Sequence, residues 1–395
     1  MCAVKSADTS AATGTDTGAP TDLQLASPSA VRPEVCGFKP YTPGLSIDEI
    51  RDRYGLAHVI KLASNENPLG TSPVVQHTLR HKANLAFRYA QSGNPRLTAA
   101  IAAHHGVPAE RVVAGNGSDE IIDLIVRVRA VPGVHNVVAF NPCFSIYELQ
   151  TRLAGVEFRQ APLAADFSFD WDGLLALVDE ATAVVFVTTP DNPSGFCPPV
   201  ADLERLAHAL PPGCLLVVDE AYMDFCGDEA GHSLLGRIDE FPNLAVLRTF
   251  SKSFGLAGLR LGYGILPVQL ADYLRRVRLP FSVNILAEEA GLAALSDDVF
   301  RAETLRVTSE GRAALTAGLT AQGCHVYPSK ANFVMFRPAP SCKSAAHLFE
   351  ELLRRGIIIR PLKSYGLPDL LRVSVGSPDE NAAFLKAAGE IMAHA

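Results

Sequence analysis

Apolar segments of strand length alternate with helix-like periods along most of this chain. From about residue 95 onward, most continuous apolar segments are followed by a stretch whose apolar positions recur every three or four residues, as on one face of a helix. The predicted strands are 111–114, 137–140, 156–159, 184–188, 215–218, 244–247 and 261–265, and predicted helices include 121–128, 171–179 and 202–210. Apolar strands separated by helices indicate a mostly parallel sheet covered on both faces. The pattern therefore predicts an α/β fold.

The pattern changes after about residue 285. A long helical period from Asp298 to about Gln322 precedes short strands at 332–336, 357–360 and 371–375, and a closing helix begins at Pro378. These segments predict a compact α+β unit of roughly a hundred residues, a usual domain size. We expect a disordered tail over 1–35, an N-terminal arm with part of the small domain over 36–70, a large domain over 71–285 and a small domain over 286–395.

The composition is that of a compact soluble protein. Of the 395 residues, 48% are hydrophobic and 19% are charged, and no window approaches the ~20 apolar residues of a membrane span. A net charge of -7 without a long basic run argues against nucleic acid as a partner. The first thirty residues lack the apolar run of a signal peptide, and the eight cysteines form no CxxC pair. We expect reduced thiols, a cytoplasmic location and no metal site.

The stretch 248–262 holds one lysine among hydroxyl-bearing, small and apolar residues. Burial disfavours an ammonium ion, so Lys252 would lose its proton more readily than a surface lysine, as a Schiff-base lysine must. Arg260 would place a fixed cation near the same pocket, suited to a phosphate. On this stretch alone, a glycine-rich loop with a solvated lysine is an equal alternative.

A glycine-bearing turn lies between the first predicted strand and the helix that follows it. The turn 115–118 would aim free backbone N–H groups at an anion, with Ser118 as the helix N-cap and a phosphate ligand. An ordinary capped helix start that binds nothing is the more common arrangement. The turn therefore becomes informative only together with other residues.

Polar residues follow two neighbouring apolar strands, at the edge where parallel sheets bind ligands. Asn192 lies in the proline-containing turn 189–195, and Asp219 follows the strand 215–218. A carboxylate there is costly unless a partner such as a protonated ring nitrogen, an internal arginine or a helix N-terminus stabilises it. Pyridoxal 5'-phosphate needs a partner for its ring nitrogen, an amine for its aldehyde and donors for its phosphate. The matching residues are Asp219, Lys252 and the set Gly117, Ser118, Ser251 and Arg260.

Five motifs stand in order along the chain. They are Ser-Asn-Glu-Asn-Pro at 64–68, Asp-Asn-Pro-Ser-Gly at 191–195, Val-Asp-Glu-Ala-Tyr at 218–222, Ser-Lys-Ser-Phe-Gly-Leu-Ala-Gly-Leu-Arg at 251–260 and Leu-Arg-Val-Ser-Val-Gly at 371–376. Each is weak to moderate alone, but together they make a strong signal. The chain resembles the fold-type I, class II pyridoxal-phosphate aminotransferases, and within them the histidinol-phosphate aminotransferases, from residue 41 to about 390. The resemblance implies a large cofactor-binding domain, whose mostly parallel sheet is sandwiched by helices, and a smaller α+β domain.

For the cofactor, the resemblance implies that Lys252 forms a Schiff base with pyridoxal 5'-phosphate and shuttles a proton between the substrate Cα and the cofactor. Asp219 would keep the pyridine nitrogen protonated, and Asn192 and Tyr222 would hydrogen-bond the phenolic oxygen. Phe144 would stack on the ring, with a core phenylalanine as the alternative. The implied phosphate ligands are Gly117, Ser118, Thr249, Ser251 and Arg260, with Tyr89 reaching the phosphate from a second subunit.

For the substrate, the resemblance implies a second set of residues. These are Arg372 for the α-carboxylate, Asn332 and Asn65 in the same site, and Tyr41 and Arg360 for the substrate phosphate. The chain departs from the family pattern after Tyr89, where Ala90 replaces the usual proline. The implied contact of Tyr89 across a homodimer with shared active sites therefore needs a test of its own.

The implied activity is the interconversion of histidinol phosphate and 2-oxoglutarate with imidazole acetol phosphate and glutamate, in histidine biosynthesis. An aromatic amino-acid aminotransferase and a threonine-phosphate decarboxylase would share the cofactor residues. Arg360 and Tyr41 favour a phosphorylated substrate, although guanidinium groups also bind carboxylates. A module that binds the cofactor without turnover is a further alternative, but the segment in front is too short and polar for a DNA-binding domain.

Overall fold

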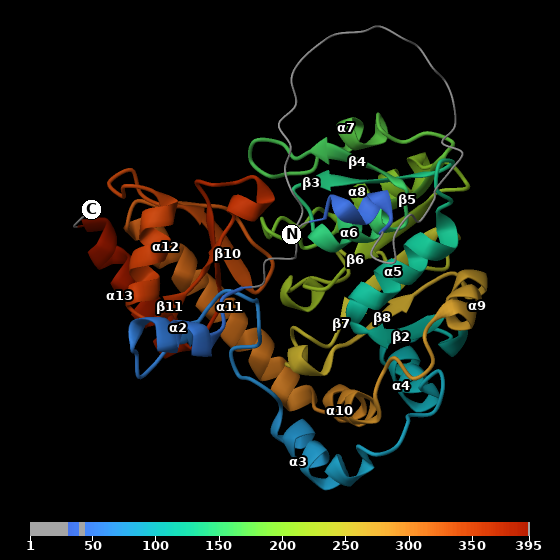
Figure 1. The fold of residues 1–395 in the computed structure, drawn as a ribbon, viewed down its shortest axis with the longest axis horizontal. Coiled ribbons are helices and arrows are strands. Elements are labelled where there is room, and N and C mark those ends of the chain that lie inside the picture. Colours follow the sequence, from blue (N-terminus) through green and yellow to red (C-terminus); the bar gives the residue numbers. More distant parts are fainter. Residues whose placement is uncertain (1–30, 39–43, 394–395) are drawn as a thin grey trace, which may run out of the picture. The chain divides into compact units, whose positions relative to one another are not determined.

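The computed structural model describes residues 31–38 and 44–393 (Figure 1). Residues 31–38 belong to a first unit, Met1–Pro40, in which helix α1 (Pro33–Cys36) has proline at its first position. The second unit, Tyr41–Ala395, contains every other described helix and strand. Among the described residues, none of the helices combines the length and the apolar character that crossing a membrane requires.

A seven-stranded sheet forms the centre of the larger part of the second unit (Figure 1). Its strands, in order across the sheet, are β2 (Val112–Asn116), β8 (Leu261–Ile265), β7 (Leu244–Thr249), β6 (Leu215–Asp219), β5 (Thr182–Thr188), β3 (Asn136–Asn141) and β4 (Glu157–Pro162). All neighbours are parallel except β8, which is antiparallel to β2 and to β7. Residues 250–260 join β7 to β8 without the long helical crossover that a parallel neighbour needs. The predicted mostly parallel sheet is confirmed, with β8 as the exception.

Helices cover both faces of this sheet. Successive strand residues point to opposite faces, so Val184 and Phe186 join one apolar core while Val185 and Val187 join another. The first core includes residues of α5 (Gly117–Arg129), α6 (Ser145–Leu153) and α9 (Val268–Val277); the second includes residues of α3 (Pro73–Lys82), α4 (Pro95–His105), α7 (Trp171–Leu175), α8 (Val200–Ala209) and α10 (Ile285–Leu295). Burial on both faces explains why the strands are continuously apolar in sequence.

A smaller antiparallel sheet packs against three helices of the C-terminal part. Its order is β12 (Arg360–Pro361), β13 (Leu371–Ser374), β10 (Phe333–Arg337) and β9 (His325–Val326). The helices are α11 (Asp298–Ala321), α12 (Ala345–Arg354) and α13 (Pro378–Ala393). Phe336, Leu348 and Phe384 belong to their shared core, so this part has an apolar core distinct from those of the large sheet.

The segment in front of the large sheet contributes to the smaller part. Helix α2 (Ile47–Tyr54) begins after Ser46, whose Oγ accepts a hydrogen bond from the backbone N of Glu49 at 3.1 Å. Strand β1 (Ile60–Lys61) pairs in parallel with β11 (Ile357–Ile358). The remaining short 3-10 helices are η1 (Ala83–Leu85), η2 (Ala109–Arg111), η3 (Met223–Phe225), η4 (Leu235–Arg237), η5 (Ala257–Leu259) and η6 (Lys363–Tyr365).

Two predicted elements differ from those observed. The helix expected over 171–179 ends at Leu175, because Leu177 and Val178 donate to carbonyls three residues back, at 3.1 Å each, and leave the α-helical path. The strand expected over 357–360 is divided, since β11 pairs with β1 whereas β12 pairs with β13. Which strand a short apolar segment joins depends on distant partners, and the local pattern does not contain that information.

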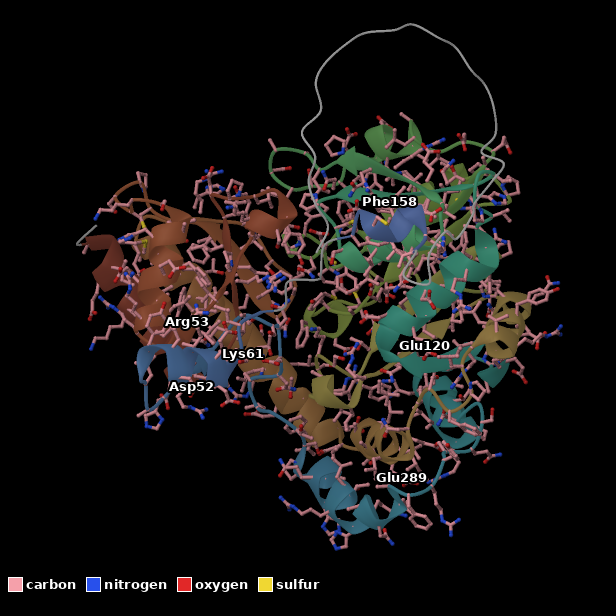
Figure 2. The ribbon with its side chains drawn as sticks, viewed as in Figure 1. Asp52, Arg53, Lys61, Glu120, Phe158 and Glu289 are labelled. Carbon is pink, nitrogen blue, oxygen red and sulfur yellow. The ribbon has the colours of Figure 1, made fainter. Side chains whose placement is uncertain are left out.

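Helix α10 packs against α3 and α4, with carboxylates in polar contact at its first turns. Glu289, labelled in Figure 2, accepts a hydrogen bond from Nη1 of Arg96 at 2.7 Å. Glu288 accepts one from Nδ2 of Asn94 at 2.8 Å. Both carboxylates are buried and hydrogen-bonded, so they hold α10 against the start of α4, which belongs to the part of the molecule that contains the large sheet.

Candidate active site

A cavity of about 260 Å³ opens at the carboxyl ends of β5, β6 and β7. This is the edge at which open α/β sheets bind their ligands. Its walls combine hydroxyls, carboxylates, an amide, a lysine and an arginine with Phe144, Ala221 and Ala257. The lining residues are Ser64, Glu66, Ser118, Asp119, Phe144, Thr188, Asn192, Asp219, Ala221, Tyr222, Thr249, Ser251, Lys252, Ala257 and Arg260. Most of the residues predicted to bind the cofactor are therefore gathered in one place.

Lys252 stands half-buried directly after β7. Its Nζ lies 3.4 Å from the carbonyl oxygen of Ser64 and 5.4 Å from the centre of the Tyr222 ring. Burial, followed by the positive charge of Arg372, lowers the pKa of Lys252 to about 8, although Glu66 acts in the opposite direction. A substantial fraction of this amine is therefore neutral at mildly alkaline pH, which a nucleophilic lysine requires.

Asp219 ends β6 and is 3% exposed. Its Oδ2 accepts a hydrogen bond from the Tyr147 hydroxyl at 2.7 Å, and its Oδ1 accepts one from the backbone N of Ala221 at 3.2 Å. These are its donors within the described part of the chain, so neither an arginine nor a helix N-terminus is bonded to it. Burial raises the pKa of Asp219 to about 6. A cationic ligand group that reached this carboxylate would stabilise its charge.

The glycine turn differs in detail from its prediction. Helix α5 begins at Gly117, and its N-cap is Asn116, whose backbone N donates to Oε2 of Glu120 at 2.6 Å (Glu120 is labelled in Figure 2). Ser118 lies inside the first turn, so the prediction of Ser118 as N-cap was wrong. Gly117 has φ of 75°, and this left-handed conformation starts the helix before Ser118. Ser118 nevertheless lines the cavity.

Arg260 closes the corner of the cavity beside this turn. Its Nη2 lies 2.9 Å from Oδ2 of Asp119, its Nη1 lies 3.5 Å from Oγ of Ser251, and its carbonyl accepts from the N of Gly117 at 2.9 Å. A Cβ at Gly117 would lie 2.5 Å from Nη2 of Arg260 and would displace the guanidinium, and the left-handed φ of 75° also favours glycine there. This arrangement suits a phosphate, because helix N–H groups, hydroxyls and a guanidinium surround a turn that has no side chain.

Arg372 lies deep in the molecule on β13 and is 5% exposed. Its Nη1 donates to Oδ1 of Asn192, and its Nη2 donates to the carbonyl of Ala63 at 3.0 Å. Its guanidinium carbon lies 4.9 Å from the centre of the Phe333 ring. The position of Arg372 is therefore fixed by packing and by hydrogen bonds from chain segments far apart in sequence.

Asn65, Tyr222 and Asn332 form a connected buried group. Nδ2 of Asn65 donates to the Tyr222 hydroxyl at 3.1 Å, and Nδ2 of Asn332 donates to the Asn65 carbonyl at 3.0 Å. Asn65 has φ of 54°, a left-handed conformation that asparagine tolerates. Within the described residues, Oδ1 of Asn332 and Nε of Arg372 are buried without a hydrogen-bond partner. Such atoms call for a ligand or water.

Six predicted site residues within the described part of the chain are not among those that line the cavity: Gly117, Asn65, Asn332, Arg372, Tyr89 and Arg360. Tyr89 is 81% exposed, and its ring stacks on that of Phe281 with centroids 4.6 Å apart. Arg360 is half-buried on β12, where it pairs in register with Arg372 of β13. Tyr41 lies outside the described residues.

The sequence analysis missed three residues that belong to this site: Tyr147, Thr188 and Asp119. Tyr147 is bonded to Asp219, while Thr188 and Asp119 line the cavity. Two signals were available, since Tyr147 follows Phe144 by one helical turn and Thr188 ends the strand beside Asp219. Their partners become visible only when the strands are placed side by side.

Comparison with known proteins identifies the family. The family model for aminotransferase class I and II matches residues 57–387. The chain belongs to the class I and II aminotransferases. The cavity thus lies in a fold that supports amino-group transfer. The half-buried Lys252, the buried Asp219 and the turn beside Arg260 belong to this aminotransferase's candidate active site.

Curated relatives share most of this aminotransferase's length. Histidinol-phosphate aminotransferase of Nitratidesulfovibrio vulgaris (strain Hildenborough) is 75% identical over 371 residues, covering 94% of this chain and 99% of that protein. Histidinol-phosphate aminotransferase of Oleidesulfovibrio alaskensis is 66% identical, covering 92% of this chain and 95% of that protein. The similarity therefore extends over both parts of the second unit.

Solved structures share the fold of this aminotransferase. The crystal structure of histidinol-phosphate aminotransferase from Sinorhizobium meliloti in complex with pyridoxal-5'-phosphate superposes with a TM-score of 0.84 at 26% identity, covering 94% of this chain and 99% of that one. Aspartate aminotransferase from Thermus thermophilus with maleate gives a TM-score of 0.79 at 22% identity, covering 92% of this chain and 99% of that one. The predicted fold-type I architecture is confirmed.

Proposed function

We infer that this chain is a pyridoxal 5'-phosphate-dependent histidinol-phosphate aminotransferase. It interconverts histidinol phosphate and 2-oxoglutarate with imidazole acetol phosphate and glutamate, a step of histidine biosynthesis. The observation that carries the chemistry is Lys252, an amine of lowered pKa in the same cavity as the buried carboxylate of Asp219. The substrate follows from relatives of that name, 75% and 66% identical over nearly the whole chain.

The residues present fit the cofactor. Within residues 31–38 and 44–393, no cation is bonded to the buried carboxylate of Asp219, which suits a partner for a protonated ring nitrogen. The turn at Gly117 carries no side chain, so a phosphate could approach the backbone at the start of α5 beside Arg260, although the N–H of Gly117 itself already donates to the Arg260 carbonyl. The residues that would hold the phosphate are Gly117, Ser118, Thr249, Ser251 and Arg260.

When bound, pyridoxal 5'-phosphate supplies an aldehyde that accepts the amino group and a ring that withdraws electrons from the substrate Cα. Lys252 would hold the aldehyde through Nζ and, once the substrate takes its place, move a proton at the substrate Cα. Asp219 would keep the ring nitrogen protonated. Tyr222 and Asn192 would donate to the phenolic oxygen, and Phe144 would cover the ring and exclude water from one side.

A second group would hold the substrate. Arg372 has an unpartnered buried Nε, and Asn332 has an unpartnered buried Oδ1. An arginine fixed by packing binds a carboxylate with little further loss of side-chain entropy. We propose that Arg372 binds the α-carboxylate of glutamate, with Asn332 and Asn65 beside it, and that Arg360 and Tyr41 contact the substrate phosphate.

A substrate panel tests the inferred activity. With 2-oxoglutarate as acceptor, histidinol phosphate is expected to have a kcat/KM at least about 100-fold above that of phenylalanine or tyrosine, because a bound phosphate adds charge-assisted hydrogen bonds. Coupled detection of glutamate measures each rate. Equal or higher rates with the aromatic amino acids would make the chain an aromatic amino-acid aminotransferase. Carbon dioxide release from threonine phosphate would instead indicate a decarboxylase.

We propose a homodimer with shared active sites, in which Tyr89 of one subunit reaches the cofactor phosphate of the other. Tyr89 is too exposed to serve its own chain's cavity, and Phe87 and Phe281 beside it are also exposed. Exposed apolar clusters mark interfaces. Sedimentation is expected to give a single species of twice the 42.2 kDa chain mass. Tyr89→Ala should weaken cofactor binding and leave the dimer intact, whereas a fully active monomer would contradict the proposal.

We also propose the division of the chain and its location. The arm and part of the small domain would span 36–70, the large cofactor-binding domain 71–285 and the small domain 286–395, with the tail over 1–35. The distinct apolar cores of the two sheets support two domains, although α10, inside the proposed small domain, contributes Ala287, Ala290 and Ala294 to the core of the large sheet. Free thiols at all seven cysteines within the described residues support a cytoplasmic location.

A further inference from the structure

The Tyr147 hydroxyl lies between two polar groups of the sheet. It is 2.7 Å from Oδ2 of Asp219 and 2.7 Å from Oγ1 of Thr188. Thr188 and Asp219 are opposite each other in the register of β5 and β6. All three side chains are buried, with Tyr147 fully inaccessible. The three groups therefore interact without competition from solvent.

The ionisation of Asp219 determines the direction of these hydrogen bonds. A carboxylate only accepts, so Tyr147 must donate its single hydroxyl proton to Asp219. The Tyr147 oxygen can then only accept from Thr188, whose hydroxyl becomes the donor. Burial and the nearby charge of Asp219 raise the pKa of Tyr147 well above its usual value, so the hydroxyl keeps its proton. The chain of donors runs from Thr188 through Tyr147 to Asp219.

We propose that Tyr147, supported by Thr188, is a positioning residue that keeps Asp219 ionised and correctly oriented for the cofactor ring nitrogen. This proposal rests on the cofactor inferred above. A donor to a carboxylate favours its charged form, and it is needed here because burial alone raises the pKa of Asp219. The other titratable groups that face this pair are Asp119, Cys143, Tyr222 and Lys252.

The packing around Tyr147 restricts its hydroxyl to one position. Its ring lies flat on that of Phe186, with centroids 4.5 Å apart and an interplanar angle of 3°. The Phe144 ring meets its edge, with centroids 5.7 Å apart. Phe144 is the N-cap of α6, three residues before Tyr147. The start of α6 thus positions both the proposed ring-stacking residue and the donor to Asp219.

The competing explanation is a core tyrosine whose hydroxyl only satisfies its own hydrogen bonds. Tyr263 provides a matched comparison within the same chain. It is also buried, and its hydroxyl lies 2.7 Å from Nε2 of His105, away from the cavity-lining residues. Tyr147→Phe and Tyr263→Phe each delete one buried hydroxyl, and only the first removes a donor to Asp219.

The test measures pyridoxal 5'-phosphate binding to the cofactor-free full chain, by fluorescence titration between pH 5.5 and 8.5. Tyr147→Phe is expected to raise Kd about tenfold at pH 7, as for loss of one hydrogen bond to an ion. Affinity for the cofactor should also begin to fall at a pH about one unit higher in Tyr147→Phe than in the parent. The reason is that Asp219 takes up a proton more readily without the donor. The ionisable groups of the cofactor titrate in the same way with the parent and with the variant, so their effect on Kd cancels when the two proteins are compared. Thr188→Val should change Kd in the same direction by a smaller factor.

Tyr263→Phe is expected to leave both Kd and the pH profile unchanged, even if it lowers Tm. If Tyr147→Phe changes only Tm and keeps the Kd and pH profile of the parent protein, the tyrosine has a structural role only. That result would overturn the proposal. If the parent chain itself takes up no cofactor, the proposed function fails instead. The two failures are therefore distinguishable from one titration series.

Discussion

Replacing Lys252 by alanine is expected to lower aminotransferase turnover by about 10²- to 10⁴-fold, the range for loss of a positioned acid–base group. The substitution removes the amine that holds the cofactor and the base that moves the substrate Cα proton. Steady-state assay of histidinol phosphate with 2-oxoglutarate measures the loss. Lys386→Ala, at an exposed position of α13, is the matched control and should retain full activity.

The same lysine should show its lowered pKa when the cofactor-free protein takes up pyridoxal 5'-phosphate. The neutral amine is the reactive form, and its fraction rises with pH through about 8. The rate of covalent uptake, trapped by borohydride, should therefore rise toward a plateau above pH 8, whereas an unshifted lysine would keep rising toward pH ~10.4. A Lys252→Ala protein that keeps a tenth of the activity or is still labelled by borohydride would refute this role.

Replacing Arg248 by methionine is expected to lower the free energy of unfolding by about 3–5 kcal/mol, the usual cost of removing one partner of a buried ion pair. The Arg248 side chain is 4% exposed, and its Nη2 lies 2.6 Å from Oε2 of Glu220, whose side chain is 0% exposed. Arg248 also pairs with Glu229 at 2.7 Å and with Asp224 at 3.4 Å. Without the guanidinium, Glu220 would remain as an uncompensated buried carboxylate.

The pH dependence of this loss has a defined sign. Burial raises the pKa of Glu220, and Arg248 opposes that increase. In Arg248→Met the folded-state pKa of Glu220 should rise further, so the cost is full at alkaline pH and falls as Glu220 takes up a proton in acid. Urea denaturation at pH 8 and pH 5.5 should therefore give a larger difference from the parent at pH 8.

Arg306→Met is the matched control for this experiment. Arg306 also contacts two carboxylates, Glu303 at 2.6 Å and Glu310 at 2.7 Å, but all three side chains are about half exposed. Exposed pairs contribute little to stability because water and salt screen them. Equal effects of the two substitutions, or a loss at Arg248 that does not depend on pH, would contradict this account.

Arg248 is also expected to affect cofactor binding, because its ion cluster contacts the segments that carry Asp219 and Lys252. Glu220 follows Asp219 directly, and Asp224 accepts a hydrogen bond from the hydroxyl of Ser253, the residue after Lys252. The buried ion cluster thus fixes the backbone on which both Asp219 and Lys252 stand. We therefore expect Arg248→Met to lose cofactor affinity as well as stability.

Local pattern was sufficient for much of the fold. Strand β5 is buried on both faces, and this burial is visible in the sequence as a continuous apolar run. The start of the helix after Ser46 is visible in the sequence because serine is a common N-cap residue. The same locality explains the errors. Ser118 has the chemistry of an N-cap, but the helix starts at the left-handed Gly117, two residues earlier than a Ser118 cap would place it. The segment 357–360, three isoleucines followed by Arg360, resembles one strand in sequence, yet its two ends pair with different strands.

The sequence by itself determined which chemistry this protein can carry. Lys252, Asp219 and Asn192 each follow an apolar strand, and the carboxyl ends of parallel strands meet at one edge of a sheet. Those residues were therefore predicted from strand pattern and residue type, with the family resemblance supplying their proposed roles. Arg260 was also predicted because it shares one short segment with Lys252.

Only the tertiary structure decided how these residues are supported. Arg372 bonds to Asn192 from 180 positions away, and Tyr147 bonds to Asp219 from 72 positions away. The unpartnered Nε of Arg372 and Oδ1 of Asn332 are likewise properties of packing. The physical reason is range: side-chain chemistry and strand periodicity are local in sequence, whereas burial, pKa and hydrogen-bond partners depend on strand order and register across the chain.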